Sequence, residues 1–366
     1  MLDPDPRAAS AGSNQRQPDV RDVIDYAEGI GELARIDGAD WNLEIYRVVA
    51  HDRNSAGVWM SPGKHGRLIR DKYFARGQPC PVVICCGQDP VLFLAGSHEI
   101  KHGVSEFAYA GYAGGHRGRA YETVASELHG LPMPSHAEIV LEGEFLPDET
   151  RPEGPFGEFT GYYASHVREE PVVRIRRVCH RHDPILTMAS PMRPPTDVSF
   201  AKCIVQSGMI WDEIETAGLS GVKGVWCHEA GAIRMFIVVA IEQMHPGHAQ
   251  QAGFLVANCR SGNYAGRWVI VVDADIDPTD LDDVVWAMST RCDPVADIEY
   301  IRRAWSTPLD PMLCEPPWES SRAIVNACRP WQWRHEFPEV ASASPALRSD
   351  IERKWAREIL AATRGR

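Results

Sequence analysis

The pattern of hydrophobic positions changes about halfway along the chain. Between residues 42 and 190, short apolar runs such as PVVICCG, AEIVLEGEF and PVVRIRRVCH are separated by turn-forming residues, and this predicts a β-rich unit. After the prolines at 191, 194 and 195, apolar residues recur at helical spacing in VSFAKCIVQSGMIWDEIETAG and HPGHAQQAGFLVANC. The apolar runs GAIRMFIVVAIE and RWVIVVDADID alternate with these segments and predict buried strands, so we expect an α/β unit here.

The two ends of the chain have patterns of their own. Residues 1–18 are polar and lack periodicity, which predicts a mobile tail, and apolar spacing predicts a helix that begins at Asp19 and closes at Gly29 or Gly31. The stretch 308–338 is rich in Pro and Trp, so we expect an extended arm packed on a neighbouring copy, with a terminal helix after it. The predicted organisation is a tail (1–18), a helical segment (19–41), a β-rich domain (42–195), an α/β domain (196–307) and an arm with its helix (308–366).

Composition and charge exclude several classes of partner. The chain has 366 residues and a net charge of -12, so broad electrostatic attraction to nucleic acid or to an anionic membrane is disfavoured. No apolar run is long enough for a membrane span or a secretory signal, which favours a cytoplasmic protein with no membrane partner. Its 10 cysteines form no CxxC pair, and we interpret them as reduced core thiols.

The first candidate site is the segment RPEGPFGEFTGYY, which places Glu153 and Glu158 on a loop rich in Gly and Pro. If the two carboxyl groups face one cavity, crowding or burial raises the pKa of one of them and makes it a proton donor near neutral pH. Two solvated surface acids on a turn are the simpler interpretation of this spacing, and a buried Arg beside them would instead favour a pair of acids with separate roles.

A second candidate site combines NLEIYR with SPGKHG. The side chains of Asn42, His65 and Glu106 offer the ligand types that suit Mn²⁺ or Mg²⁺, with Arg47 and Lys64 close by in the sequence. A lone His beside a Gly is more often an ordinary surface histidine, so this spacing is weak evidence on its own.

Other charged positions are expected to be structural. Glu138, Glu142 and Glu144 share a parity in AEIVLEGEF, which predicts the solvent-facing side of a strand. The acidic run DADIDPTDLDD lacks the Gly and the terminal Glu of an EF-hand calcium loop.

Taken together, the motifs YRVVAHDRN, SPGKHGR, CPVVICCGQDP, GVSEFAYAG, AEIVLEGEF, RPEGPFGEFTGYY and WVIVVDADIDP resemble the UbiD-like decarboxylases. The resemblance covers approximately residues 42–340. It implies a mixed α+β and α/β fold, in which a β-rich split barrel that binds flavin precedes an α/β C-terminal domain. It also implies prenylated FMN as the cofactor, with Mn²⁺ or Mg²⁺ and a K⁺ ion, and a flavin prenyltransferase as its supplier.

Carried over by resemblance, the catalytic set falls on three residues. Glu158 would donate the proton to the reacting carbon, while Glu153 and Arg47 form an ion pair beside it. The metal ligands fall on Asn42, His65 and Glu106. The resemblance also implies a larger set of cofactor-binding residues, namely Asn42, Ile45, Tyr46, Arg47, Lys64, His65, Ser97, Glu106 and Arg267.

One departure from the family pattern affects the activity that the resemblance implies. Members have an N-terminal domain before the N-x4-R motif, whereas here the first helix runs almost directly into YRVVAHDRN, so segment 19–41 is expected to be a remnant of that domain. The leading hypothesis is a homodimeric or larger decarboxylase of an aromatic or α,β-unsaturated acid, of the hydroxybenzoate type. A shortened, catalytically silent homologue that acts as a flavin-binding or assembly subunit is the alternative. A third hypothesis, a metal-dependent hydrolase that uses His65 and the acids, is disfavoured because the sequence contains no HExxH-type or dinuclear set of metal ligands.

Overall fold

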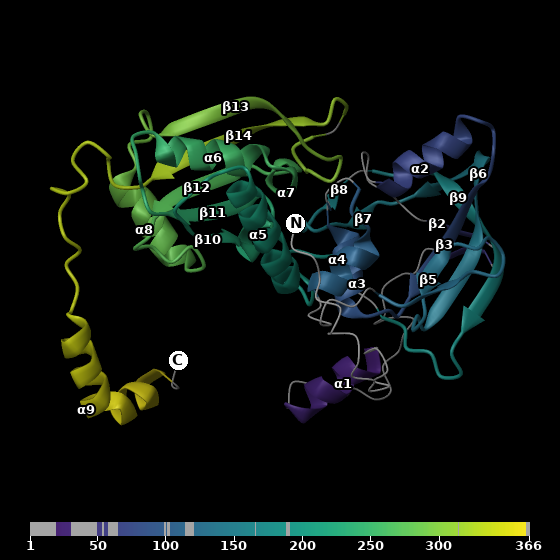
Figure 1. Ribbon diagram of the computed structural model, residues 1–366, viewed down its shortest axis with the longest axis horizontal. Coiled ribbons are helices and arrows are strands. Elements are labelled where there is room, and N and C mark those ends of the chain that lie inside the picture. The colour runs from purple at the N-terminus through teal and green to yellow at the C-terminus, as the bar shows by residue number, and fades with distance from the viewer. Residues whose placement is uncertain are drawn as a thin grey trace, which may run out of the picture. The chain divides into compact units, whose positions relative to one another are not determined.

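The structure is a computed structural model that describes residues 20–30, 50–52, 55–57, 65–98, 100, 103–113, 121–164, 166–187, 191–313 and 315–363. Residues 1–328 form one compact unit, and residues 329–366 form a second one. The helices of the described residues are α1 (Val20–Gly29), α2 (His65–Phe74), α3 (Pro90–Ser97), α4 (Glu106–Ala113), α5 (Ser199–Thr216), α6 (His248–Asn258), α7 (Arg260–Asn263), α8 (Leu281–Arg291) and α9 (Pro345–Thr363) (Figure 1). None of them is both long and apolar enough to cross a bilayer.

The strands lie in two main sheets and two small hairpins. They are β1 (Ala50–Asp52), β2 (Ser55–Gly57), β3 (Cys80–Cys86), β4 (Thr123–Ala125), β5 (Pro132–Pro134), β6 (Ile139–Glu153), β7 (Phe156–Gly157), β8 (Tyr163–Ala164), β9 (Arg168–His180), β10 (Val222–Cys227), β11 (Phe236–Ile241), β12 (Trp268–Asp273), β13 (Ile298–Trp305) and β14 (Glu319–Ala327).

The first main sheet is antiparallel and contains the predicted β-rich unit. Its order is β1-β2-β9-β6-β3, and the long strands β6 and β9 pair from Ile139 opposite His180 to Glu153 opposite Arg168. The side chains of Phe145 and Val173 are buried on one face, against α2. This pairing confirms the strands that the alternating sequence pattern predicted in this region, and it places Glu153 at the far end of β6.

The second main sheet has a parallel centre, as expected for an α/β unit. Its order is β10-β11-β12-β14-β13, in which β11, β12 and β14 run parallel and the two edge strands are antiparallel to their neighbours. Alternate residues of β11 enter different cores: Ile237 packs with α5 and α6, whereas Val238 packs with α8. Burial on both faces explains why these strands are continuous apolar runs in the sequence.

One segment differs from the sequence-based expectation. Residues 319–327 fall within the stretch that we expected to form an extended arm, but they form β14, between β12 and β13 (Figure 1). The apolar residues Ala323, Ile324 and Val325 are buried in this strand. The prediction of an arm over these residues is wrong because the run AIVNA supplies the missing strand of the sheet, whereas Pro and Trp dominate only its flanks.

The acids of AEIVLEGEF also differ from expectation. Glu138 and Glu142 are almost completely buried, so the prediction that they face solvent is wrong. The Glu138 carboxylate accepts hydrogen bonds from Arg21, Arg181 and the Ile185 amide, and Glu142 accepts one from the Leu128 amide. These donors come from distant segments, and together they offset the cost of burying the two charges.

Helix α5 packs on both the second sheet and the α3–α4 region within the first compact unit. Its residues Ile210 and Ile214 belong to the core of the second sheet, while Met209 packs with Leu92 and Ile100 beside α3 and α4. The beginning of α5 therefore has a defined position relative to α3, which ends at Ser97, and α4, which begins at Glu106.

Candidate active site

Glu158 lies in a tight turn between two short strands. β7 and β8 pair antiparallel, with Phe156 opposite Ala164 and Gly157 opposite Tyr163. Within the turn, the Glu158 amide donates to the Tyr162 carbonyl at 3.1 Å, and the Glu158 carbonyl accepts from the Gly161 amide at 2.8 Å. Both backbone groups of Glu158 are thus fixed locally, so the direction of its side chain is set by the hairpin.

Two glycines let this turn approach the chain segment that leads into α5. A Cβ atom on Gly157 would lie 2.6 Å from the Pro191 carbonyl oxygen, and one on Gly161 would lie 2.7 Å from the Arg193 Cα. Gly161 also has a φ of +84°, a conformation that residues with a side chain rarely adopt. The glycines of GEFTG therefore serve close backbone packing, which holds the Glu158 turn against residues 191–193.

The same turn is anchored to the second sheet. The Thr160 hydroxyl donates to the Leu309 carbonyl at 3.4 Å, and Thr160 itself is buried. The guanidinium carbon of Arg234 lies 5.6 Å from the centre of the Phe159 ring, in a cation–π contact. The two residues that follow Glu158 therefore contact groups from the α/β part of the chain.

The Glu158 carboxyl is in an environment that favours its neutral form. Burial raises the pKa of Glu158 to about 7, although the positive charges of Arg168 and Lys202 pull this pKa downward. Burial is the larger effect, so at neutral pH roughly half of the Glu158 carboxyl groups carry a proton. Glu153, at the end of β6, is also buried, and it lies opposite Arg168 in the strand register. The interpretation of both acids as solvated surface residues is therefore wrong.

The raised pKa makes a prediction about stability. Because the folded protein binds the Glu158 proton more tightly than the unfolded chain does, this carboxyl destabilises the fold increasingly as the pH rises from near 4.5 to about 7. After allowance for partial exposure, we expect Glu158→Gln to raise the free energy of unfolding by about 1–2 kcal/mol at pH 8, and by close to nothing at pH 4. Urea denaturation of the wild type and the variant at pH 8 and pH 4 measures this difference in the free energy of unfolding. An equal change at the two pH values would contradict the prediction.

The structure places three more of the predicted site residues. The Ser97 hydroxyl, at the end of α3, donates to the Leu94 carbonyl at 2.8 Å, and Glu106 is the first residue of α4. Arg267 pairs with the buried carboxylate of Asp310, at an Nη2–Oδ2 distance of 2.5 Å. The roles of these three residues toward a cofactor stay predictions.

The remaining predicted residues cannot be placed. Asn42, Ile45, Tyr46, Arg47 and Lys64 lie outside the described residues, and so does the side chain of His65, although its backbone begins α2. Their assignment to the catalytic pair, the metal or the flavin therefore remains a prediction.

Sequence reasoning missed the two basic residues whose charges lower the pKa of Glu158. Arg168 begins β9 and Lys202 lies in the first turn of α5, and both charges act on the Glu158 carboxyl. Each is a single charged residue at the start of an ordinary element, so neither belongs to a recognisable motif. Arg168, Lys202 and Glu158 belong to three separate segments, and only the folded structure lets the two charges act on the Glu158 carboxyl.

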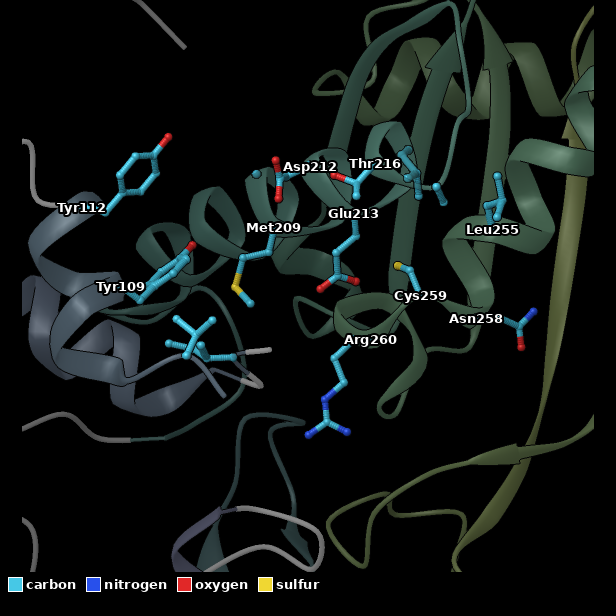
Figure 2. A pocket seen from close by; sticks show the side chains of 15 residues that line it. Tyr109, Tyr112, Met209, Asp212, Glu213, Thr216, Leu255, Asn258, Cys259 and Arg260 are labelled. Atoms are coloured by element: carbon cyan, nitrogen blue, oxygen red, sulfur yellow. The ribbon is translucent and has the colours of Figure 1, made fainter. Parts of the chain in front are cut away.

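A large hollow lies farther along α5. It has a volume of about 900 Å³ and is lined by residues of α4, α5, α6 and α7 and of the segment before α4. Figure 2 shows the side chains of Met209, Glu213 and Arg260 around it. Glu213 accepts hydrogen bonds from the amide and the hydroxyl of Ser261 at 2.9 and 2.7 Å, and Asp212 adds a second carboxylate to the lining. Of the predicted site residues that the structure describes, none lines this hollow.

Comparison with known proteins agrees with this architecture. Two family models match the chain, and both describe 3-octaprenyl-4-hydroxybenzoate carboxy-lyase: its Rift-related domain matches residues 33–194 and its C-terminal domain matches residues 199–327. A relative, pyrrole-2-carboxylic acid decarboxylase of Pseudomonas aeruginosa, is 31% identical over 334 residues, which cover 87% of this chain and 66% of the relative.

Solved structures of similar proteins give the same result. Vanillic acid decarboxylase of Sedimentibacter hydroxybenzoicus in its closed form is 26% identical, with a TM-score of 0.72 over 85% of this chain and 64% of that one. The UbiD-class enzyme HmfF of Pelotomaculum thermopropionicum in complex with FMN is 28% identical, with a TM-score of 0.69 over 81% of this chain and 63% of that one. The chain thus spans just under two thirds of the length of these relatives.

An antiparallel sheet followed by an α/β sheet defines a mixed α+β protein, and it shares this architecture with UbiD-class structures. The chain belongs to the UbiD family, whose two domain models together account for most of its length.

Proposed function

We propose that this chain catalyses the non-oxidative decarboxylation of an aromatic or α,β-unsaturated carboxylic acid, and carboxylation in the reverse direction. The observation that carries the proposal is the half-buried carboxyl of Glu158, whose pKa is raised to about 7 by burial and which is therefore available as a proton donor at neutral pH. The relatives that share its two domains include decarboxylases of pyrrole-2-carboxylic acid and vanillic acid.

The proposed role of Glu158 is to supply the proton that replaces the departing carboxylate. When the carbon–carboxylate bond breaks, carbon dioxide leaves and the bonding electron pair stays on the substrate carbon. Glu158 then transfers its proton to that carbon, forming a carbon–hydrogen bond, and the resulting carboxylate regains a proton from water. The raised pKa matters because an ionised Glu158 has no proton to transfer. Glu153 is buried and lies opposite Arg168 in the strand register, and we propose that it acts as the second acid of the site.

The cofactor of this reaction would be prenylated FMN, which accepts electron density from the substrate when bound. The described residues fit such a group in their chemistry. Glu106, at the start of α4, has the oxygen ligands that suit Mn²⁺ or Mg²⁺ beside a phosphate, and Ser97 has a hydroxyl on the neighbouring helix. HmfF has been solved with FMN and, in an evolved dimeric form, with prFMN. A flavin prenyltransferase would supply the cofactor, and the chain would act as a homodimer or larger oligomer.

The proposal is tested by producing the full chain together with a flavin prenyltransferase. The visible spectrum of the purified protein reports bound flavin, and carbon dioxide release is measured with a panel of hydroxybenzoates and with pyrrole-2-carboxylate. We expect bound flavin and release from at least one acid. Bound flavin without release from any acid would contradict the proposed activity.

A second candidate is a catalytically silent homologue that binds flavin without turnover and acts as an assembly subunit. The departure from the family pattern before YRVVAHDRN motivates it. The same experiment separates the two, because the subunit retains flavin and releases no carbon dioxide from any acid.

A further inference from the structure

Arg234 lies between two aromatic rings beside the turn that carries Glu158. Its guanidinium carbon is 5.6 Å from the centre of the Phe159 ring and 5.3 Å from the centre of the Tyr264 ring, and only 9% of the residue is exposed. The attraction between a cation and an aromatic face is stronger where water is excluded, so this burial strengthens both contacts. Because Phe159 directly follows Glu158, the guanidinium contacts the neighbour of the proposed proton donor.

The second ring, that of Tyr264, is packed within the α/β part of the chain. Only 4% of Tyr264 is exposed, and its ring centre lies 4.7 Å from that of Trp305, at the end of β13. Arg234 therefore lies between a ring that the α/β core holds in place and a ring that belongs to the Glu158 turn.

The backbone before Arg234 is strained. Ala232 and Ile233 have φ values of +51° and +66°, and this conformation is unusual for a β-branched residue such as Ile233. The Arg234 amide donates to the Ala232 carbonyl at 2.8 Å, which closes a tight three-residue turn with Ile233 at its centre. Such strain persists only where the surrounding structure imposes it, and it is concentrated at functional sites.

The other strained positions also adjoin this part of the structure. Among the described residues, a positive φ at a residue other than glycine occurs at Ala232, Ile233, Ala265 and His166. Ala265 follows Tyr264, and the His166 carbonyl oxygen would lie 3.0 Å from a Cβ on Gly154, in the loop that leads to Glu158. The strain thus coincides with the segments that hold the Glu158 turn, which favours a role in positioning over general packing.

Two contacts hold the Glu158 turn to the α/β part of the chain. One is the hydrogen bond from the Thr160 hydroxyl to the Leu309 carbonyl, which is long for its type at 3.4 Å. The other is the contact of Phe159 with the buried guanidinium of Arg234. Because a long hydrogen bond is weak, the contact with Arg234 is expected to be the stronger restraint on the turn.

We propose that Arg234 is a positioning residue for the proton transfer: it holds the Phe159 ring against the α/β part and so fixes the position of the Glu158 carboxyl. The effect on turnover rests on the proposed function, whereas the effect on the position of the turn does not. The positive charges that lower the pKa of Glu158 are those of Arg168 and Lys202, so Arg234 is expected to act through the turn and not through its charge.

The test is a double-mutant cycle of Arg234→Met, Phe159→Leu and the double variant. The cycle is needed because Arg234 makes further contacts, which the single substitution also removes. The first readout is the titration of Glu158 by carbon-13 NMR, with its signal assigned by its absence in Glu158→Gln. Loss of either partner loosens the turn and exposes it to water, so both single variants should titrate at a lower pH than the wild type.

The double variant decides whether Arg234 acts through Phe159. It should titrate close to the single variants, because the second substitution removes a contact that is already lost. Shifts that add in the double variant, or an unchanged titration in Arg234→Met, overturn the inference. If Arg234→Met does not fold, Phe159→Leu tests the same contact from the other side, and an unchanged titration there has the same consequence.

Turnover of the flavin-loaded protein is the second readout. We expect Arg234→Met to lower kcat at least about tenfold, with a smaller change in KM, because the proton donor is displaced while the substrate still binds. A kcat within about twofold of the wild type overturns the inference. A wild type that releases no carbon dioxide contradicts the proposed function alone, because the titration still reports the position of the turn.

Arg70→Met is the matched control. Arg70 is also buried between two rings, at 5.3 Å from the centre of Phe74 and 5.9 Å from that of Phe145, but it lies on α2 against the first sheet. Its substitution should lower the free energy of unfolding and leave the titration of Glu158 unchanged. Equal shifts in Arg70→Met and Arg234→Met would show that the loss of any such arginine loosens the turn, and would overturn the inference.

Discussion

Glu158→Gln should lower kcat by about 10²–10⁴-fold while the protein keeps its flavin, because the amide preserves the shape of the side chain but has no acidic proton to transfer. The backbone of the turn is held by the bonds of Glu158 with Tyr162 and Gly161, which the substitution leaves intact. Steady-state release of carbon dioxide and the visible spectrum of the same sample measure the two effects separately.

Glu169→Gln is the matched control for this substitution. Glu169 is an exposed acid of β9 that lies opposite Pro152, close in sequence to the site, and its carboxylate accepts only a hydrogen bond from Thr150 among the described contacts. We expect it to keep kcat within a few fold. If Glu158→Gln retained the activity of Glu169→Gln, Glu158 would have no part in the proton transfer.

Gly161→Ala should damage both folding and turnover. The added Cβ would lie 2.7 Å from the Arg193 Cα, and because the contact is with backbone the chain itself must move. The positive φ adds strain, so we expect a loss of about 2–4 kcal/mol in the free energy of unfolding. Displacing the turn also moves Glu158 away from the reacting carbon, which should lower kcat about 10²-fold.

Gly218→Ala is a control that separates the effect of backbone strain from the effect of a steric clash. Gly218 has a φ of +93°, and a Cβ placed there would meet no atom within 4 Å. This control should cost only about 1 kcal/mol and leave kcat unchanged. Equal losses of stability and activity in the two variants would show that the close approach to Arg193 has no part in positioning Glu158.

The fold was largely predictable because its helices and strands bury distinct faces. The runs that became β11 and β12 are apolar throughout since both faces are covered, and α5 has the spacing of a helix with one buried side. β14 was missed because it begins with polar residues and the fully buried Arg322. The main-chain carbonyls that accept hydrogen bonds from Arg322 belong to other segments, at Gly262, Asn263 and Trp305.

The site was predictable only where it lies within one segment. The spacing in EGPFGEF placed Glu153 and Glu158 on one loop, but not their burial, because that depends on contacts with Pro191, Arg193 and Leu309. The same limit explains the error at Glu138, whose partners Arg21 and Arg181 come from distant segments. A strand parity alone carries no information about such partners.

The most direct test of the account is deuterium exchange into the decarboxylated product, catalysed by the flavin-loaded protein in heavy water at a series of pH values. The account predicts that deuterium enters the ring carbon that bore the carboxylate and that Glu158→Gln abolishes the exchange. The exchange rate should rise as the pH rises through about 7, because the ionised Glu158 carboxylate must first remove the ring proton. Exchange that persists in Glu158→Gln, or a flavin-loaded wild type that exchanges nothing, would contradict it.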